Sequence, residues 1–264
     1  MPHLRQRPNA SNPRHAITPA SAGWDHVGFE LRDLAAGDVH AGVGEGRELC
    51  LVLVAGRARV IAGVTDFGEL GERMNPFDGL PWSVYVPAGV GFRVEAVTPV
   101  ELAICSAPAT GRLSARLIPP ADVGEETRGE GTNTRYVRNI LPESASAESL
   151  LVVEVITPGG NWSSYPPHRH DRDDLPAESL LEETYYHRLR PSQGFGFQRV
   201  YTDDGTLDEA IAFTDRDVVL VPRGYHPVGA PHGYDLYYLN VMAGPKRTWK
   251  FHNDPAHAWI VQPK

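Results

Sequence analysis

The sequence predicts an all-β protein built from two similar halves. Gly (26) and Pro (23) are frequent, which is typical of many short strands joined by turns. Short β-prone runs bounded by Gly, Pro or Asp recur along most of the chain. Residues 83–92 and 218–227 share one pattern, a strand followed by Val-Pro-x-Gly. Together these observations predict two copies of a small barrel or jelly roll in tandem.

The elements follow in chain order. Residues 1–22 are polar, rich in Pro and without periodicity, which predicts a poorly ordered arm or an extended strap. Six β-prone runs then predict a first barrel over 23–120, and a Gly-, Glu- and Thr-rich stretch predicts a linker over 121–134. A second barrel is expected over 135–264. Helix is scarce, and only residues 174–181 resemble a helical turn.

Composition excludes several classes of partner. The chain has 25 Lys and Arg against 33 Asp and Glu, a formal charge of −8, which gives no electrostatic attraction to nucleic acid or anionic lipid. No apolar stretch approaches the roughly 20 residues of a transmembrane helix, and no signal segment opens the chain. Both cysteines lie in apolar runs, so no disulfide framework is expected. We expect a cytoplasmic protein without nucleic-acid or membrane partners.

Histidines gather in the second half. Seven of the 11 histidines lie between residues 168 and 257, and none lies between 41 and 167. His168 and His170 are separated by one residue, so an extended strand would place both rings on one face, roughly 6 to 7 Å apart. A His-x-His pair is also found as an exposed surface pair, but here two imidazoles can converge on one metal ion.

Further ligands are expected on neighbouring segments. Glu182 and Glu183 point to opposite faces of a strand, and Glu183 is favoured because it shares its face with Tyr185 and His187. His226 follows the Val-Pro-x-Gly turn, which can return its ring to the same site. Three histidines and one carboxylate suit one divalent ion among Zn, Mn, Fe and Ni, with Zn the first choice.

These residues resemble the two motifs of the cupin superfamily. The matching residues are Gly160, His168, His170, Glu183, Pro222, Gly224 and His226. Two departures are visible: residues 171–181 lengthen the gap before Glu183, and the second motif is one residue shorter. Longer strings, from 158–171 to the C-terminal 249–260, resemble the 5-deoxy-glucuronate isomerases of myo-inositol catabolism. This resemblance implies two cupin barrels, of which the second holds the metal and the first is a degenerate copy. The residues agree, because the repeated segment 83–92 contains Phe92 and no histidine, whereas 218–227 contains His226.

The resemblance also implies an activity. The reaction is an aldose-ketose isomerisation of 5-deoxy-D-glucuronate to 2-deoxy-5-keto-D-gluconate, with the metal stabilising an enediolate and with no nucleotide or flavin. Glu182, Tyr185 and His187 are the unranked candidates for moving the proton. A metal-assisted hydride shift would need no such base.

The substrate carboxylate calls for a cationic side chain. Arg199 is the first choice, followed by Arg223 and Lys246. Two other functions stay open because fold does not fix function: a metal-dependent dioxygenase and a sugar-acid-binding protein without turnover. We expect a homo-oligomer.

Overall fold

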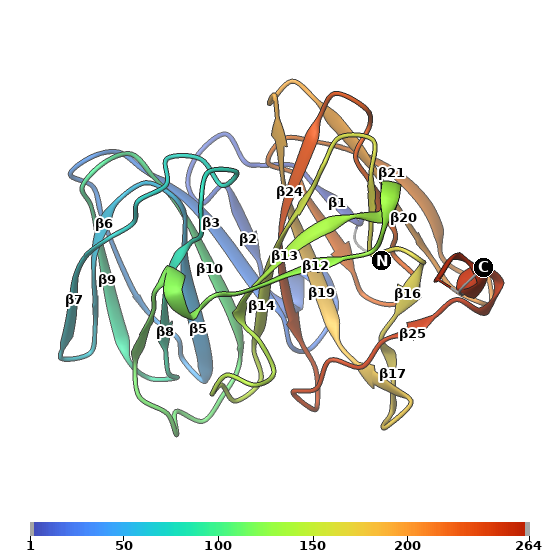
Figure 1. Ribbon diagram of the computed structural model, residues 1–264. Helices are drawn as coiled ribbons and strands as arrows, with labels where there is room; N and C mark the ends of the chain where they lie inside the picture. Colours follow the sequence, from blue (N-terminus) through green and yellow to red (C-terminus); the bar gives the residue numbers. More distant parts are fainter. Residues whose placement is uncertain (1–2, 262–264) are drawn as a thin grey trace.

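The computed structural model describes residues 3–261 and consists mainly of antiparallel strands in two halves (Figure 1). Each half combines one large sheet with a separate sheet of four strands. The all-β prediction is therefore confirmed.

The first half carries a six-stranded sheet in the order β11-β8-β5-β10-β3-β2 and a four-stranded sheet in the order β4-β9-β6-β7. Their bounds are β2 (His15–Ile17), β3 (Gly28–Leu34), β4 (Val39–Val43), β5 (Arg47–Ala55), β6 (Ala58–Ala62), β7 (Thr65–Leu70), β8 (Trp82–Val86), β9 (Gly91–Ala96), β10 (Val100–Pro108) and β11 (Arg116–Ile118).

The second half carries a seven-stranded sheet in the order β1-β22-β19-β24-β14-β13-β12 and a four-stranded sheet in the order β15-β23-β20-β21. Their bounds are β1 (Arg5–Gln6), β12 (Gly124–Arg128), β13 (Arg135–Leu141), β14 (Leu151–Thr157), β15 (Trp162–Ser163), β19 (Glu182–Arg190), β20 (Phe195–Tyr201), β21 (Asp208–Thr214), β22 (Val218–Val221), β23 (Val228–Gly229) and β24 (Asp235–Ala243).

The two halves repeat one topology. The run β8-β5-β10-β3 in the first large sheet corresponds to β22-β19-β24-β14 in the second, and the small sheets also match strand for strand. The repeated Val-Pro-x-Gly segments follow β8 and β22, which are equivalent strands. The internal repeat predicted from the sequence therefore extends to the whole of each half.

The two large sheets pack against each other in the middle of the molecule (Figure 1). Strand β5 is buried on both sides for this reason. Its residues Cys50, Val52 and Val54 belong to the core shared with the second half, where Tyr186 and Val241 lie. The alternate residues Leu49, Leu51 and Leu53 fill the interior of the first half. An almost continuous apolar run is what a strand covered on both faces requires.

The N-terminal arm and the linker are built into the sheets. Within the range 1–22, β1 pairs with β22 of the second half and β2 pairs with β3 of the first, so the arm is an extended strap across both. Within 121–134, β12 pairs with β13 in the second large sheet. The domain boundaries themselves stay predictions, and their outer ends at 1–2 and 262–264 lie outside the described residues.

The remaining elements are short. The helical turn expected at 174–181 is wrong, because β17 (Asp171–Asp174) and β18 (Glu178–Leu180) form a hairpin there. The other elements are α1 (Pro19–Ala22), η1 (Pro120–Asp122), η2 (Gly131–Asn133), β16 (His168–Arg169), β25 (His252–Asn253) and the 3₁₀ helix η3 (Pro255–Val261). In the part of the chain that the structure describes, no helix has both the length and the apolarity to cross a membrane. The cytoplasmic location stays a prediction.

Candidate metal centre

The His-x-His segment begins on β16 (His168–Arg169), which pairs with β25 near the C-terminus, and His170 follows directly after this strand (Figure 1). His168 and His170 are both buried, and their ring centroids are 6.2 Å apart. This separation agrees with the roughly 6 to 7 Å that strand alternation predicts. The two rings therefore share one face of the segment.

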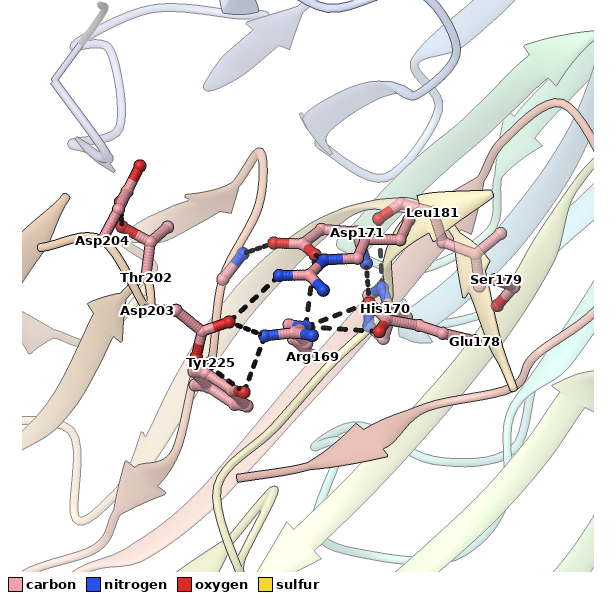
Figure 2. A network of polar contacts seen from close by, with 12 residues as sticks. Arg169, His170, Asp171, Glu178, Ser179, Leu181, Thr202, Asp203, Asp204 and Tyr225 are labelled. Atoms are coloured by element: carbon pink, nitrogen blue, oxygen red, sulfur yellow. Dashed lines mark hydrogen bonds and ion pairs between the residues drawn. The ribbon is translucent and has the colours of Figure 1, made fainter. Parts of the chain in front are cut away.

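Arg169, between the two histidines, points away from them and anchors the segment. Its guanidinium contacts four side chains, those of Asp171, Glu178, Asp203 and Tyr225 (Figure 2). Glu178 comes from the β17–β18 hairpin, so the insertion that departs from the cupin spacing supplies the anchor. Asp171 in turn accepts a hydrogen bond of 2.7 Å from the backbone N of Gly224. This bond ties the His-x-His segment to the turn that carries His226.

His226 is positioned by the turn after β22. Gly224 has φ +89°, and a Cβ there would collide with the backbone oxygen of Tyr201, so this position requires glycine. The His226 ring is fully buried, and its Nδ1 donates a hydrogen bond of 2.9 Å to the carbonyl of Gly224. The Nε2 atom is therefore the one left for the centre of the site.

The three histidines converge, with one candidate ligand atom from each lying within 4.8 Å of the others. The carboxylate of Glu183 lies beside two of them, with Oε2 3.1 Å from Nε2 of His170 and 3.2 Å from Nε2 of His226. Nδ1 of His170 donates to the carbonyl of Leu181 at 3.0 Å. Such backbone bonds fix the tautomer of a histidine that ligates a metal through its other nitrogen.

The donor set fits a divalent metal ion. Although burial would raise it, the pKa of Glu183 is lowered to about 2 by His170 and His226, so the carboxylate is ionised. Burial and the neighbouring histidines lower the pKa of His168 well below its usual value, which leaves a neutral imidazole. Oε2 of Glu183 is close to the buried Nε2 of His226, but this nitrogen has no hydrogen-bond partner among residues 3–261. A cation at this point would balance the carboxylate and accept the free lone pair.

The inward-facing side chains of β19 differ in chemistry from those of β5, the equivalent strand of the first half. Glu183, Tyr185 and His187 alternate along this strand, and Glu183 is paired in register with Val221. In the first half, the equivalent β5 pairs Leu49 with Val86 at the corresponding place, followed inward by Leu51 and Leu53. Three leucines thus replace the glutamate, tyrosine and histidine. The interior of the first half is an apolar core, as expected for a degenerate copy.

Comparison with known proteins places the chain in a family. The model of the KduI/IolB family matches residues 2–260. The chain belongs to this family. Two curated relatives, from Geobacillus kaustophilus (strain HTA426) and Bacillus subtilis (strain 168), are 56% and 50% identical to it and are both named 5-deoxy-glucuronate isomerase. The alignments cover 97% and 94% of this chain and 94% and 92% of the relatives.

Solved structures agree with this assignment. The crystal structure of an IolB-like protein from Salmonella typhimurium LT2 has a TM-score of 0.97 and 52% identity, covering 98% of this chain and 100% of that one. A mutant of oxalate decarboxylase from Bacillus subtilis has a TM-score of 0.67 over 96% of this chain and 80% of its own, at 12% identity. That distant likeness concerns the fold alone, and it supports the cupin fold predicted from the sequence.

Among the residues that this KduI/IolB protein was expected to use for moving a proton, only Tyr185 lies at the cluster. Its ring centroid is 5.8 Å from that of His226. Glu182 points to the opposite face of β19, where its carboxylate accepts hydrogen bonds from the backbone N atoms of three residues, Asp25, His26 and Val27. His187 lies farther along the strand, stacked on Phe213 with the ring centroids 3.7 Å apart.

The three cationic residues expected to bind the carboxylate are not brought to the site. Arg199 is half exposed and forms a bidentate ion pair with Asp208. Lys246 forms an exposed ion pair with Asp173. Arg223 lines a separate polar pocket with Asp203 and Asp204. Strand alternation alone does not distinguish such surface pairs from cations that face a cavity.

A cavity of about 910 Å³ that opens beside His168 contains residues that the sequence analysis missed. Its lining includes Arg128, Arg135, Tyr165, Phe251, Asn253 and Ile260. Phe251 packs against the ring of His168 with 4.7 Å between centroids. These residues come from β12, β13, the segment before β16 and the C-terminus. None is one of the matched cupin motif residues, and the signals were the two strings that resemble the family, 158–171 with Tyr165 and 249–260 with Phe251, Asn253 and Ile260.

Proposed function

We propose that the protein converts 5-deoxy-D-glucuronate to 2-deoxy-5-keto-D-gluconate in inositol breakdown, as an intramolecular oxidoreductase. The observation that carries the proposal is the buried cluster of three histidines and a glutamate in a chain of this family. Relatives 50% and 56% identical over nearly the whole chain bear the name 5-deoxy-glucuronate isomerase. The substrate is a small sugar acid.

The reaction balances without an external oxidant or reductant. The hydrogen on C2 passes to the aldehyde carbon C1, and the hydroxyl hydrogen on O2 passes to O1. The aldehyde becomes an alcohol while the neighbouring alcohol becomes a ketone. No nucleotide or flavin is required for this exchange.

His168, His170, Glu183 and His226 would hold one divalent ion. Zn is the first choice, and Mn, Fe and Ni suit the same borderline set of nitrogen and oxygen donors. When bound, such an ion supplies Lewis-acid polarisation of the substrate oxygens. Burial of all four side chains supports the assignment, because a dry site strengthens each charge interaction within it.

Tyr185 is the residue that we expect to exchange a proton with the substrate oxygens. Its hydroxyl lies 2.8 Å from Oγ of Ser164. Burial, reinforced by the charge of Glu183, raises the pKa of Tyr185 well above its usual value. The phenol therefore keeps its proton at neutral pH and can donate it to the oxygen that becomes a hydroxyl. Glu182 and His187 are turned to other partners and are not retained in this role.

The test combines metal analysis with an NMR assay of the purified protein. We expect close to one divalent ion per chain and migration of the carbonyl from C1 to C2 of 5-deoxy-D-glucuronate. In D₂O, deuterium in the new hydroxymethyl group, at the carbon that was C1 of the substrate, would indicate a proton carried by a base, whereas its absence would indicate a hydride shift. Oxygen uptake without isomerisation would support a dioxygenase instead. Sugar-acid binding without turnover would support a binding protein.

Association of copies is a second part of the proposal. The outer face of the small sheet β15-β23-β20-β21 exposes the aromatic side chains of Trp162, Phe195 and Phe197 by 41%, 42% and 48%. Exposed aromatic side chains gathered on one sheet are typical of protein interfaces. We expect light scattering to give a mass above the 28.9 kDa of one chain, and Phe197→Glu to lower it. A single-chain mass for the wild type would contradict the proposal.

A further inference from the structure

The cavity beside His168 contains a guanidinium that forms no ion pair with a carboxylate of residues 3–261. Arg135 is half-buried at the start of β13 and lines this cavity together with Tyr165 and Phe251. Its Nη1 donates to the carbonyls of Asn133 and Tyr165, each at 3.1 Å. These two bonds hold the side chain in place and leave Nε and Nη2 without hydrogen bonds to residues 3–261. The Arg135 guanidinium is thus held in a fixed position, while its Nε and Nη2 can still donate hydrogen bonds to a ligand.

The other charged groups of the cavity differ from Arg135. The Arg128 guanidinium contacts Glu126 and lies over the ring of Trp249, 5.0 Å from its centroid. The exposed Glu130 also lines the cavity, but among the described residues no carboxylate oxygen lies within 4.0 Å of the Arg135 guanidinium. Arginine is favoured for holding a carboxylate because its planar fork can form two parallel hydrogen bonds. Arg135 is therefore the cavity's unmatched site for an anion.

The position of Arg135 relative to the histidine cluster suits a substrate with two different ends. His168 contributes to both the cluster and the cavity wall that includes Arg135. In a uronic acid the aldehyde and the carboxylate lie at opposite ends of a six-carbon chain. One end can meet the cluster while the other meets the guanidinium.

We propose that Arg135 binds the carboxylate of the sugar acid and sets the preference of the enzyme for a uronate over a neutral aldose. This inference rests on the proposed function for the identity of the substrate. It replaces Arg199, Arg223 and Lys246, which lie in ion pairs or in another pocket. Arg135 orients the substrate and takes no part in the proton transfer.

The experiment compares the metal-loaded wild type with Arg135→Gln and Arg135→Lys. A hydrogen bond to a charged group contributes enough that Arg135→Gln should raise KM for 5-deoxy-D-glucuronate about 10- to 100-fold. The kcat/KM for 5-deoxy-D-glucose, which has a hydroxymethyl group in place of the carboxylate, should change less than about threefold because that contact is absent. Arg135→Lys should restore part of the loss. Metal content should match the wild type in both variants.

Arg199→Gln is the control, because it removes an arginine that is already paired with Asp208 on the surface. An increase in KM for the uronate in Arg199→Gln but not in Arg135→Gln would overturn the inference. Equal losses for the acid and the neutral sugar in Arg135→Gln would also overturn it, because they would indicate general damage to the cavity.

A binding measurement separates this inference from the proposed function. Calorimetric titration with glucuronate and with glucose needs no turnover. If the wild type does not isomerise 5-deoxy-D-glucuronate but binds glucuronate in an Arg135-dependent way, the proposed function fails and the inference stands. If the wild type isomerises the substrate and Arg135→Gln keeps the same KM and the same glucuronate affinity, the function stands and the inference fails.

Discussion

Oε2 of Glu183 lies 3.1 Å from Nε2 of His170. This contact joins a central strand of the large sheet to a short segment that precedes it by a hairpin. Both side chains are almost completely buried. An ionised carboxylate is held at such a place only when cations or hydrogen bonds compensate it. The contact therefore indicates that a metal ion bound by His170 and Glu183 would compensate the charge of this carboxylate.

Replacing His170 with alanine should weaken metal binding at least about a hundredfold, because loss of an outer hydrogen-bonding partner alone costs about 10- to 100-fold. Isomerase activity should fall with the metal content, and the circular dichroism of the β fold should stay unchanged. The measurement is elemental analysis after dialysis against a weak chelator. His232→Ala is the matched control, because His232 is exposed and lies outside the cluster. Equal metal content in the two variants would place the ion elsewhere.

Replacing Tyr185 with phenylalanine should lower kcat about 10²- to 10⁴-fold, the usual contribution of a positioned proton donor or acceptor. Metal content should not change. Tyr186→Phe is the control, because it removes a hydroxyl from the opposite face of the same strand, where that hydroxyl donates to Glu101 at 2.6 Å. Stopped-time NMR assays at saturating substrate measure both variants. The assignment of Tyr185 fails if the two variants lose the same small fraction of activity.

The sequence was sufficient to predict that His168, His170 and Glu183 lie together, because its signals are local, and their role as metal ligands stays a proposal. One intervening residue fixes His168 and His170 on one face, and strand alternation separates Glu183 from Glu182. Alternation between neighbouring residues is enough to predict that the two glutamates face opposite sides of the strand. The partner of Glu182, however, is the backbone of residues 25–27, more than 150 positions away. No pattern near position 182 indicates that contact.

The position of Arg135 was not predictable for a similar reason. Its cavity is assembled from β12, β13, the approach to β16 and the C-terminal η3, and no spacing rule links those segments. The pairing of β1 with β22 in the sheet of the second half is likewise a contact between distant parts of the chain. Short-range periodicity predicted which residues form strands. The long-range pairings that decide which side chains meet needed the three-dimensional structure.

Replacing Glu154 with glutamine should destabilise the protein by about 3 to 5 kcal/mol, because it leaves a buried arginine without its counter-charge. Arg73 of the first half donates two hydrogen bonds of 2.8 Å to Glu154 on β14 of the second half. Differential scanning calorimetry should show a lower Tm. Asp208→Asn, which breaks the exposed pair with Arg199, should cost about 1 kcal/mol or less. Similar shifts in both variants would show that the buried pair contributes no more than the exposed one.

The buried imidazole of His187 makes the stability of the fold depend on pH. Burial lowers the pKa of this histidine to about 3 from 6.5, so the unfolded chain binds a proton at pH 5 that the folded chain does not. Stability is therefore fully present above pH 6.5 and is lost as the pH falls toward 3. One such group contributes about 1.4 kcal/mol per pH unit, or about 2 kcal/mol between pH 7 and 5.

His187→Gln should reduce that loss, because glutamine keeps an N–H donor toward Gln198, whose Oε1 lies 3.3 Å from Nε2 of His187, and does not titrate. Urea unfolding at pH 7 and pH 5 measures the difference for the wild type and the variant. His257→Gln, which removes a partly exposed histidine near the C-terminus, should leave the pH dependence as it is. If His187→Gln and the wild type lose the same stability between the two pH values, His187 is not the group that binds the proton on unfolding, and the acid sensitivity belongs to other buried histidines such as His15, whose pKa burial also lowers.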